Sequence, residues 1–155
     1  TLMGVFAGGY ITGKLKPTLS TFNNCNAFGS GSMQYNDTGN NNNLFGYTAG
    51  HRLTGSDNTG MGHEVLVNGS NISRNTAIGA GSGFWLYSGN DNVFVGNNAG
   101  RDGQVRTVSG TTVIGATACS TRDNEIVIGK ATDTHVTIMG VEFTKAQLIA
   151  LKALV

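Results

Sequence analysis

A glycine that returns about every seventeen residues, always directly after an apolar residue, is the feature that most restricts the fold of this chain. The repeat glycines are Gly29, Gly46, Gly62, Gly79, Gly96, Gly115 and Gly129, with spacings of 17, 16, 17, 17, 19 and 14. The residues directly before them are Phe28, Phe45, Met61, Ile78, Val95, Ile114 and Ile128. Self-similarity at so even an interval is typical of a repeat architecture.

Other positions keep register with these glycines. Four residues earlier stand Asn42, Asn58, Asn75 and Asn92, and three residues later stand Ser32, Ala49, Val65, Ser82, Ala99 and Ala118. A period near 17 is too short for a pair of helices, and no 3.6-residue pattern runs through these segments. The repeat therefore predicts an all-β fold, a β-solenoid (β-helix) whose turns each contain two or three short strands.

The physics of such a coil explains the residue types. Successive turns stack about 4.8 Å apart, so equivalent residues lie over one another. We expect an internal apolar column, a hydrogen-bonded asparagine ladder, and glycine at corners that need a positive φ. Gly60 and Glu64 interrupt the apolar pattern of the third turn, which favours protruding loops there.

The pattern divides the chain into three parts. Residues 24–140 contain the repeats and are predicted to form the solenoid. Residues 1–23 keep the repeat poorly, and Pro17 argues against a central strand, so we expect an irregular N-terminal segment. Residues 141–155 are predicted to form a strand and a helical cap, since Thr144 and Gln147 have the spacing of a capping box before an apolar run. That short α-helix would pack on its own solenoid end or in a three-helix cap.

Neighbouring apolar residues in the strands indicate an oligomer. Leu44–Phe45, Phe94–Val95 and Val127–Ile128 would point to opposite faces of a strand. One coil encloses only one of these faces. We expect the other to be covered by identical chains around an axis parallel to the rod, or alternatively by loops of the same chain.

Composition argues against several functions. The net charge is +1 and only 12% of the residues are charged, which gives no electrostatic footprint for nucleic acid. No apolar run is long enough for membrane insertion. The three histidines and two cysteines lack metal-ligand spacing, and no GxSxG motif occurs. We therefore expect no metal, no cofactor and no catalytic residue.

An aromatic segment is the candidate binding site. Phe84, Trp85 and Tyr87 stand between two repeats where other turns are polar or charged. By register, His51, Arg52 and Arg101 of other turns share the same edge of the rod. Rings with polar neighbours suit carbohydrate binding, because rings stack on sugar faces while polar groups bind hydroxyls. The alternative is that Trp85 packs in a subunit seam or a loop core.

The repeats also resemble a known group. Residues 75–83 (NTAIGAGSG) and 92–100 (NVFVGNNAG) are similar to the head repeats of YadA-like trimeric autotransporter adhesins, and the same motif type occurs in distal parts of bacteriophage tail fibres and tailspikes. Residues 123–130 and 137–140 look more like the phage set.

The resemblance implies a homotrimer that forms a structural and receptor-binding part of a phage tail fibre. It would lie on the virion and recognise a host cell-surface glycan or protein. Such segments often precede an intramolecular chaperone that cleaves itself off. The alternatives are a trimeric adhesin head on a bacterial surface, and a tailspike fragment that depolymerises capsular polysaccharide as a lyase or hydrolase. We expect a binding protein rather than an enzyme.

Overall fold

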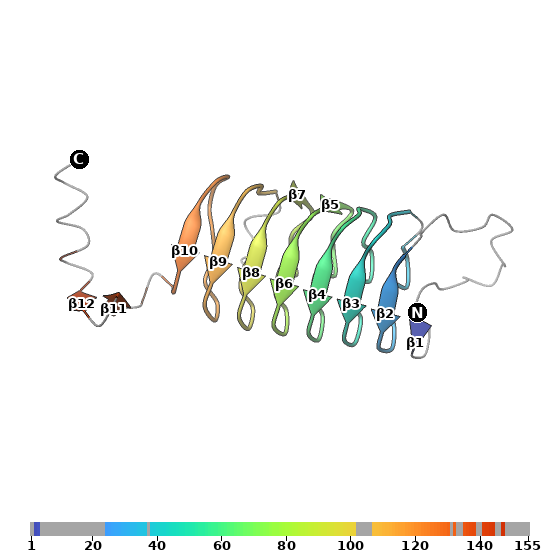
Figure 1. Cartoon of the computed structure of the whole chain (residues 1–155), viewed down its shortest axis with the longest axis horizontal. Helices are drawn as coiled ribbons and strands as arrows, with labels where there is room; N and C mark the ends of the chain where they lie inside the picture. The colour runs from blue at the N-terminus through green and yellow to red at the C-terminus, as the bar shows by residue number, and fades with distance from the viewer. Residues whose placement is uncertain are drawn as a thin grey trace, which may run out of the picture.

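Eight short parallel strands stack into a rod. The computed structural model describes residues 2–3, 24–36, 38–101, 107–130, 132, 135–138, 141–144 and 147. The ladder runs, in spatial order, through β1 (Leu2–Met3), β2 (Asn26–Phe28), β3 (Asn43–Phe45), β4 (Thr59–Met61), β6 (Thr76–Ile78), β8 (Val93–Val95), β9 (Thr112–Ile114) and β10 (Ile126–Ile128). Each strand belongs to one turn of the coil and pairs with the strand of the next turn (Figure 1). The predicted all-β solenoid is confirmed.

A second, smaller parallel sheet lies on another side of the coil. It consists of β5 (Asn71–Ser73) and β7 (Ser88–Asn90), which pair in register (Figure 1). A parallel bridge from Ser88 to Thr107 extends this contact to the following turn. The central turns thus have the two strands per turn that the period allows.

The repeat glycines stack at the corner that follows each strand of the ladder. Gly46 and Gly79 have φ values of +143° and +126°, which side-chain-bearing residues rarely adopt. A Cβ added at Gly79 would lie 2.6 Å from the carbonyl carbon of Gly96 in the next turn. Glycine is therefore required at this corner both by the backbone conformation and by the close approach of the turns.

The middle residue of each three-residue strand points into the coil and forms the core. This inner column consists of Ala27, Leu44, Gly60, Ala77, Phe94 and Val113, with Val127 partly buried at its end. Gly60 does not disturb it. A Cβ there would lie 2.7 Å from Cδ2 of Leu44 and 3.0 Å from Cγ1 of Val65, so neighbouring side chains already fill the space. The third turn, expected to be irregular, instead keeps the register of β3, β4 and β6.

Buried asparagines form a continuous ladder beside the core. Asn42, Asn58, Asn75 and Asn92 are fully buried. Oδ1 of Asn42 accepts hydrogen bonds from the backbone N–H and Nδ2 of Asn58, at 2.9 and 3.0 Å. The same pair of bonds joins Asn58 to Asn75 and Asn75 to Asn92. Buried amides are costly when unpaired, so this ladder satisfies polar groups that the narrow coil cannot expose to water. The predicted ladder is confirmed.

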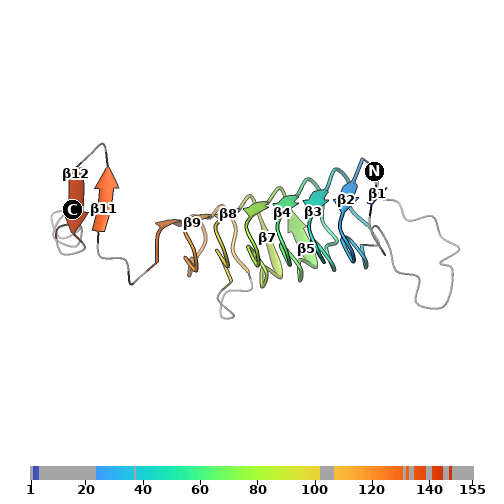
Figure 2. The ribbon, with the colours of Figure 1, turned by 90° about the horizontal axis from the view of Figure 1, so that it is seen from below.

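The two ends of the chain are only partly described. Of the N-terminal segment, Leu2–Met3 joins the ladder as β1. After β10, the strands β11 (His135–Ile138) and β12 (Val141–Thr144) form a separate antiparallel pair (Figure 2). Thr144 and Gln147 make the reciprocal bonds of a capping box, with the Gln147 N–H donating to Thr144 Oγ1 at 3.3 Å and the Thr144 N–H donating to Gln147 Oε1 at 2.9 Å. The helix predicted behind them lies outside the described residues. Within the described residues, no helix has the length and apolar character needed to cross a membrane.

Candidate functional site

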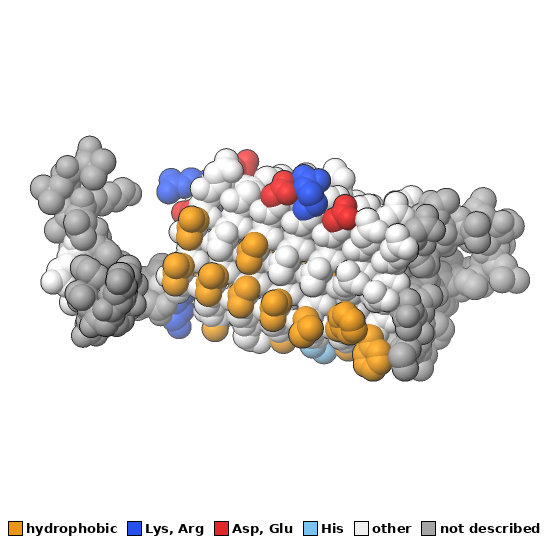
Figure 3. Space-filling model, viewed as in Figure 1, with side chains coloured by type: hydrophobic (Ala, Val, Ile, Leu, Met, Phe, Trp, Pro, Cys, Tyr) orange, Lys and Arg blue, Asp and Glu red, His pale blue; other side chains and the backbone are white. Residues whose placement is uncertain are grey.

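An exposed row of apolar side chains runs along the ladder. We call it the apolar row; it consists of Phe28, Phe45, Met61, Ile78, Val95, Ile114 and Ile128. Phe28 is 52% exposed and Ile128 is 66% exposed, while Val95 is half-buried. Figure 3 shows the row as an orange stripe that follows the rod. No charged residue interrupts it.

The row follows from the geometry of the three-residue strands. Neighbouring strand residues point to opposite faces, so the first and third residues point outward when the second is buried. In β3, Leu44 is buried while Phe45 is exposed, and its ring stacks with that of Phe28 at a centroid distance of 6.4 Å. From β2 to β10, each strand of the ladder therefore has an inner face that the coil covers and an apolar residue on its outer face that the described part of the chain leaves uncovered.

The predicted aromatic segment lies on a different edge of the rod, in the turn between β6 and β7. The rings of Phe84 and Trp85 meet edge to face at a centroid distance of 4.8 Å, and Trp85 is 37% exposed. The Arg101 guanidinium, from the next turn, lies 4.3 Å above the Phe84 ring centroid. We call these three residues the aromatic edge. The coil thus brings together three of the six candidate residues.

Arg101 is held by more than the ring. Its Nη1 donates a hydrogen bond to Oδ1 of Asn98 at 2.8 Å. Beside it lies an open hollow of about 350 Å³, lined by Asn98, Arg101, Thr117 and Cys119. A guanidinium held over a ring, with remaining N–H donors beside a hollow, can bind an oxygen-bearing ligand.

The other three candidates do not join this cluster. His51 and Arg52 lie on the same edge two turns away, because the Arg52 N–H bonds to Val67 O and Asn68 Nδ2 bonds to Phe84 O. Tyr87 is 55% exposed further along its turn. The structure therefore divides the predicted site into the aromatic edge and three residues that lie apart from it.

His51 has its own surroundings. Its Nε2 is 3.0 Å from Oε1 of Gln34, and its ring meets Tyr35 edge to face at 4.7 Å. Burial, and to a smaller extent the positive charge of Arg52, lowers the pKa of His51 below its ordinary value of 6.5. Folding thus favours the neutral imidazole over the protonated one, relative to a histidine in water.

Sequence analysis missed a further ring pair and the support of Arg101. Tyr47 and His63 stack at 5.3 Å on successive turns. The available signal was their shared place directly after a repeat glycine. The signal for Asn98 was its spacing. It stands three residues before Arg101 on the same turn, within hydrogen-bonding reach of the arginine side chain.

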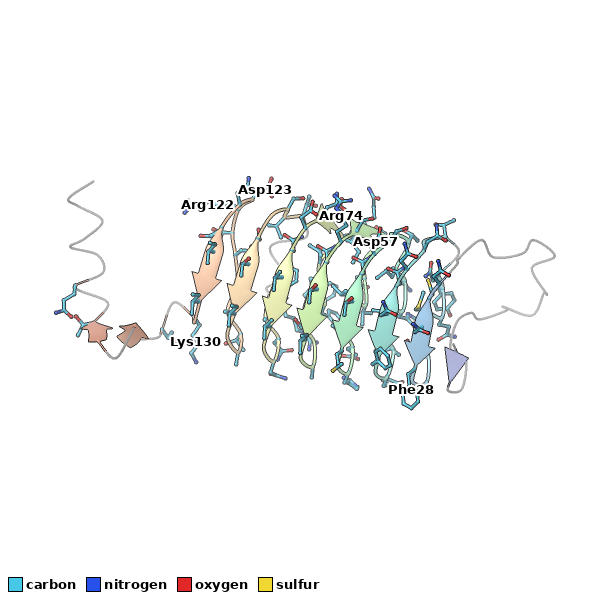
Figure 4. All side chains as sticks on the ribbon, viewed as in Figure 1. Phe28, Asp57, Arg74, Arg122, Asp123 and Lys130 are labelled. Atoms are coloured by element: carbon cyan, nitrogen blue, oxygen red, sulfur yellow. The ribbon has the colours of Figure 1, made fainter. Side chains whose placement is uncertain are left out.

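A charged edge lies across the ladder from the glycine corners. Figure 4 places Asp57, Arg74, Arg122 and Asp123 at one edge of the strands and Phe28 and Lys130 at the other. Arg74 makes a two-bond contact with Asp91, with Nε–Oδ1 at 2.7 Å and Nη2–Oδ2 at 2.9 Å. The hydrogen bond from Arg74 and its charge lower the pKa of Asp91. Exposed pairs of this kind contribute little stability, so we assign this edge to turn formation and solvation.

In the described part of the chain, no three residues of the types His, Cys, Asp and Glu lie close enough together to hold a metal ion. Comparison with known proteins gives no match. No family model matches this chain, and neither a curated protein nor a solved structure matches it.

Proposed function

We propose that this chain is a rigid, trimeric segment of an extracellular fibre of the bacteriophage tail-fibre type, and that it displays an edge that binds a host cell-surface glycan. The apolar row supports the assembly, and the aromatic edge supports the binding. The resemblance of residues 75–83 and 92–100 to head and tail-fibre repeats supports the setting.

The apolar row is the observation that carries the proposal. Monomeric soluble proteins rarely expose large contiguous apolar patches. Here seven successive turns each contribute one apolar side chain to the same line (Figure 3). A partner that covers this row removes the exposed apolar side chain of every one of these turns from water, which is favourable.

A parallel copy of the same chain is the partner that fits the row. Its own row repeats at the same rise per turn, so equivalent side chains meet along the whole length when two copies lie side by side. The row contains no charge, so identical copies do not repel one another there. A closed ring of three such contacts leaves no row uncovered.

Mass measurement tests the assembly. We expect light scattering to give three times the chain mass of 16.1 kDa. Phe45→Asp places a charge in the row and should reduce the mass to that of one chain. Tyr87→Asp is the matched control, because Tyr87 is equally an exposed aromatic residue but lies outside the row. A wild-type chain that stays monomeric would refute the proposal.

The aromatic edge supports glycan binding because it combines an exposed ring with a fixed polar group. Trp85 offers a face for a sugar ring, and Arg101 offers hydrogen bonds beside it. We expect the trimer to bind a subset of bacterial surface glycans on an array, and Trp85→Ala to lose this binding while keeping its mass and circular dichroism. A Trp85→Ala trimer that binds the same glycans and still adsorbs to host cells would remove the binding proposal.

The runner-up function is a capsular polysaccharide depolymerase, and it can be separated from binding alone. Incubation of the trimer with each polysaccharide it binds should produce neither new reducing ends nor unsaturated sugars. The appearance of either product would replace the binding function with a hydrolase or a lyase, respectively.

A further inference from the structure

We infer that the hollow beside Arg101 binds the carboxylate of an acidic sugar. This inference rests on the proposed glycan-binding function and names the class of ligand. It is carried by the way Arg101 is fixed, by the charge of the hollow and by the position of Trp85.

The Arg101 guanidinium is both fixed and incompletely used. Its Cζ lies over the Phe84 ring and its Nη1 bonds to Asn98, so two contacts hold the side chain in place. A guanidinium carries five N–H donors, and the bond to Asn98 uses one. Among the described residues no carboxylate pairs with Arg101. Its remaining donors match the two oxygens of a carboxylate, which arginine binds through paired hydrogen bonds.

Glycine at position 81 makes this arrangement possible. An added Cβ at Gly81 would lie 2.8 Å from Nη1 of Arg101 and would also collide with Oδ1 of Asn98. The equivalent positions of other turns carry side chains, such as Thr48 and Glu64, so the backbone there does not itself demand glycine. The empty space over Gly81 is therefore what lets Arg101 and Asn98 lie together against the rod.

The hollow provides room for the sugar and a positive charge. The described residues that line it are Asn98, Arg101, Thr117 and Cys119, and Arg101 is the one charged residue among these four. Its volume of about 350 Å³ lies within the range of small-molecule sites, about 300–1,000 Å³. Thr117 is exposed at its rim, where a hydroxyl can bond to sugar hydroxyls.

Trp85 and Arg101 contact the same ring, Phe84, so they lie within the span of a disaccharide. One sugar unit can stack on Trp85 while the carboxylate of a neighbouring unit binds Arg101. Two sources supply this chemistry: uronic acids within a polysaccharide, and sialic-acid-type sugars at the end of a chain. Both present a carboxylate on a sugar ring.

The test compares acidic and neutral versions of the same glycan on the intact trimer. The probes are oligogalacturonates with their carboxyl-reduced forms, and sialyllactose with lactose. We expect one acidic probe to bind at least about tenfold more tightly than its neutral partner, because hydrogen bonds to a charged carboxylate are stronger than those to a neutral hydroxyl. The preferred pair identifies which of the two sources the hollow accepts. Raising the salt concentration should reduce this difference.

Two variants and one control make the result specific. Arg101→Met should remove the acidic preference, and Thr117→Trp should reduce acidic binding by filling the hollow without changing charge. Arg122→Met removes an exposed arginine outside the hollow and should leave the preference unchanged. Mass and circular dichroism are measured for each variant, so a folding failure is seen directly.

The outcomes separate this inference from the function on which it rests. If neutral and acidic probes bind equally, and Trp85→Ala abolishes both, glycan binding stands and the carboxylate site is refuted. If Arg101→Met keeps the acidic preference, the carboxylate binds elsewhere and the assignment to Arg101 is wrong. If no probe or array glycan binds the trimer, both the proposed function and this inference fall.

Discussion

Asn75 donates both its backbone N–H and its side-chain Nδ2 to one acceptor, Oδ1 of Asn58, at 3.1 and 3.0 Å. The same Nδ2 also bonds to Gly89 O at 3.0 Å. Asn58, Asn75 and Asn92 thus each join their own turn to the preceding one through side chain and backbone together. The asparagine ladder therefore hydrogen-bonds successive turns to one another inside the coil, as the paired β-strands do along its wall.

Asn75→Ala should destabilise the rod by about 1–3 kcal/mol, the cost of leaving buried polar groups unpaired. The change removes the acceptor of both Asn92 donors and the donor to Gly89 O. Denaturant unfolding, with variant and wild type at one protein concentration, measures the loss. Asn97→Ala is the control, since Asn97 is exposed, and it should shift the midpoint little. Equal effects of the two changes would show that the ladder adds no stability.

Gly79→Ala should prevent normal folding or lower the melting temperature strongly. The new Cβ would lie 2.6 Å from the carbonyl carbon of Gly96, and the φ of +126° is unfavourable for alanine. Gly31→Asn is the matched control at a glycine with φ of +69°, because asparagine tolerates that left-handed region and Asn98 already occupies the equivalent position. Circular dichroism melts compare them. A normal melt for Gly79→Ala would contradict the requirement for stacked glycines.

Phe94→Ala and Phe45→Ala should separate folding from assembly. Phe94 is buried in the inner column, so its loss should cost about 3–5 kcal/mol and reduce the β signal on mild heating. Phe45 is 41% exposed, so its loss should lower the mass in dilute solution while the chain keeps its β signal. Light scattering and circular dichroism on the same samples give both readouts. The reverse pattern would mean that the two faces of the strand are assigned the wrong way round.

Stability should fall as the pH drops below the ordinary histidine pKa of 6.5, and His51 should contribute to the fall. Its pKa is lowered in the folded chain, so between the folded and unfolded values only the unfolded chain is protonated there, and stability rises with pH. The stability that neutral His51 contributes is fully present above pH 6.5. It is lost as the pH falls through the pKa of His51 in the folded chain.

Melting temperatures at pH 7.5 and 5.5 check this, with His51→Gln as the comparison. Glutamine keeps a side-chain amide near Gln34 but does not titrate, so its difference between the two pH values should be smaller. The Arg74–Asp91 pair does not interfere, because the pKa of Asp91 is lowered from 3.8 and its carboxylate stays ionised across this range. An equal pH difference in both proteins would exclude His51 as a source.

The sequence determined the coil because its constraints are local and periodic. A glycine stands at one corner of every turn, with an asparagine four residues earlier in four of the turns and a small residue three residues later in six, so the spacing alone predicts a solenoid with a ladder. The pattern also indicated two apolar faces per strand. It did not indicate which residue of Leu44–Phe45 points inward, since both are large and apolar.

Contacts between turns that differ in amino-acid sequence were harder to predict. Gly60 looked like an interruption because the sequence does not show that Leu44 and Val65 fill its place. The stacking of Arg101 on Phe84 depends on a rotamer choice and on the space over Gly81, neither of which a period reveals. His51 was grouped with these residues from register along the edge, but the two-turn offset separates them.

The stacked corners have a consequence for how such a molecule can vary in length. Every turn presents nearly the same backbone to its neighbours, so a whole unit can be gained or lost without altering the contacts of the others. Each such event would move the two ends by about 4.8 Å while leaving the outward-facing rows continuous. The reach of the molecule is thus adjustable in uniform increments, independently of what any single unit displays.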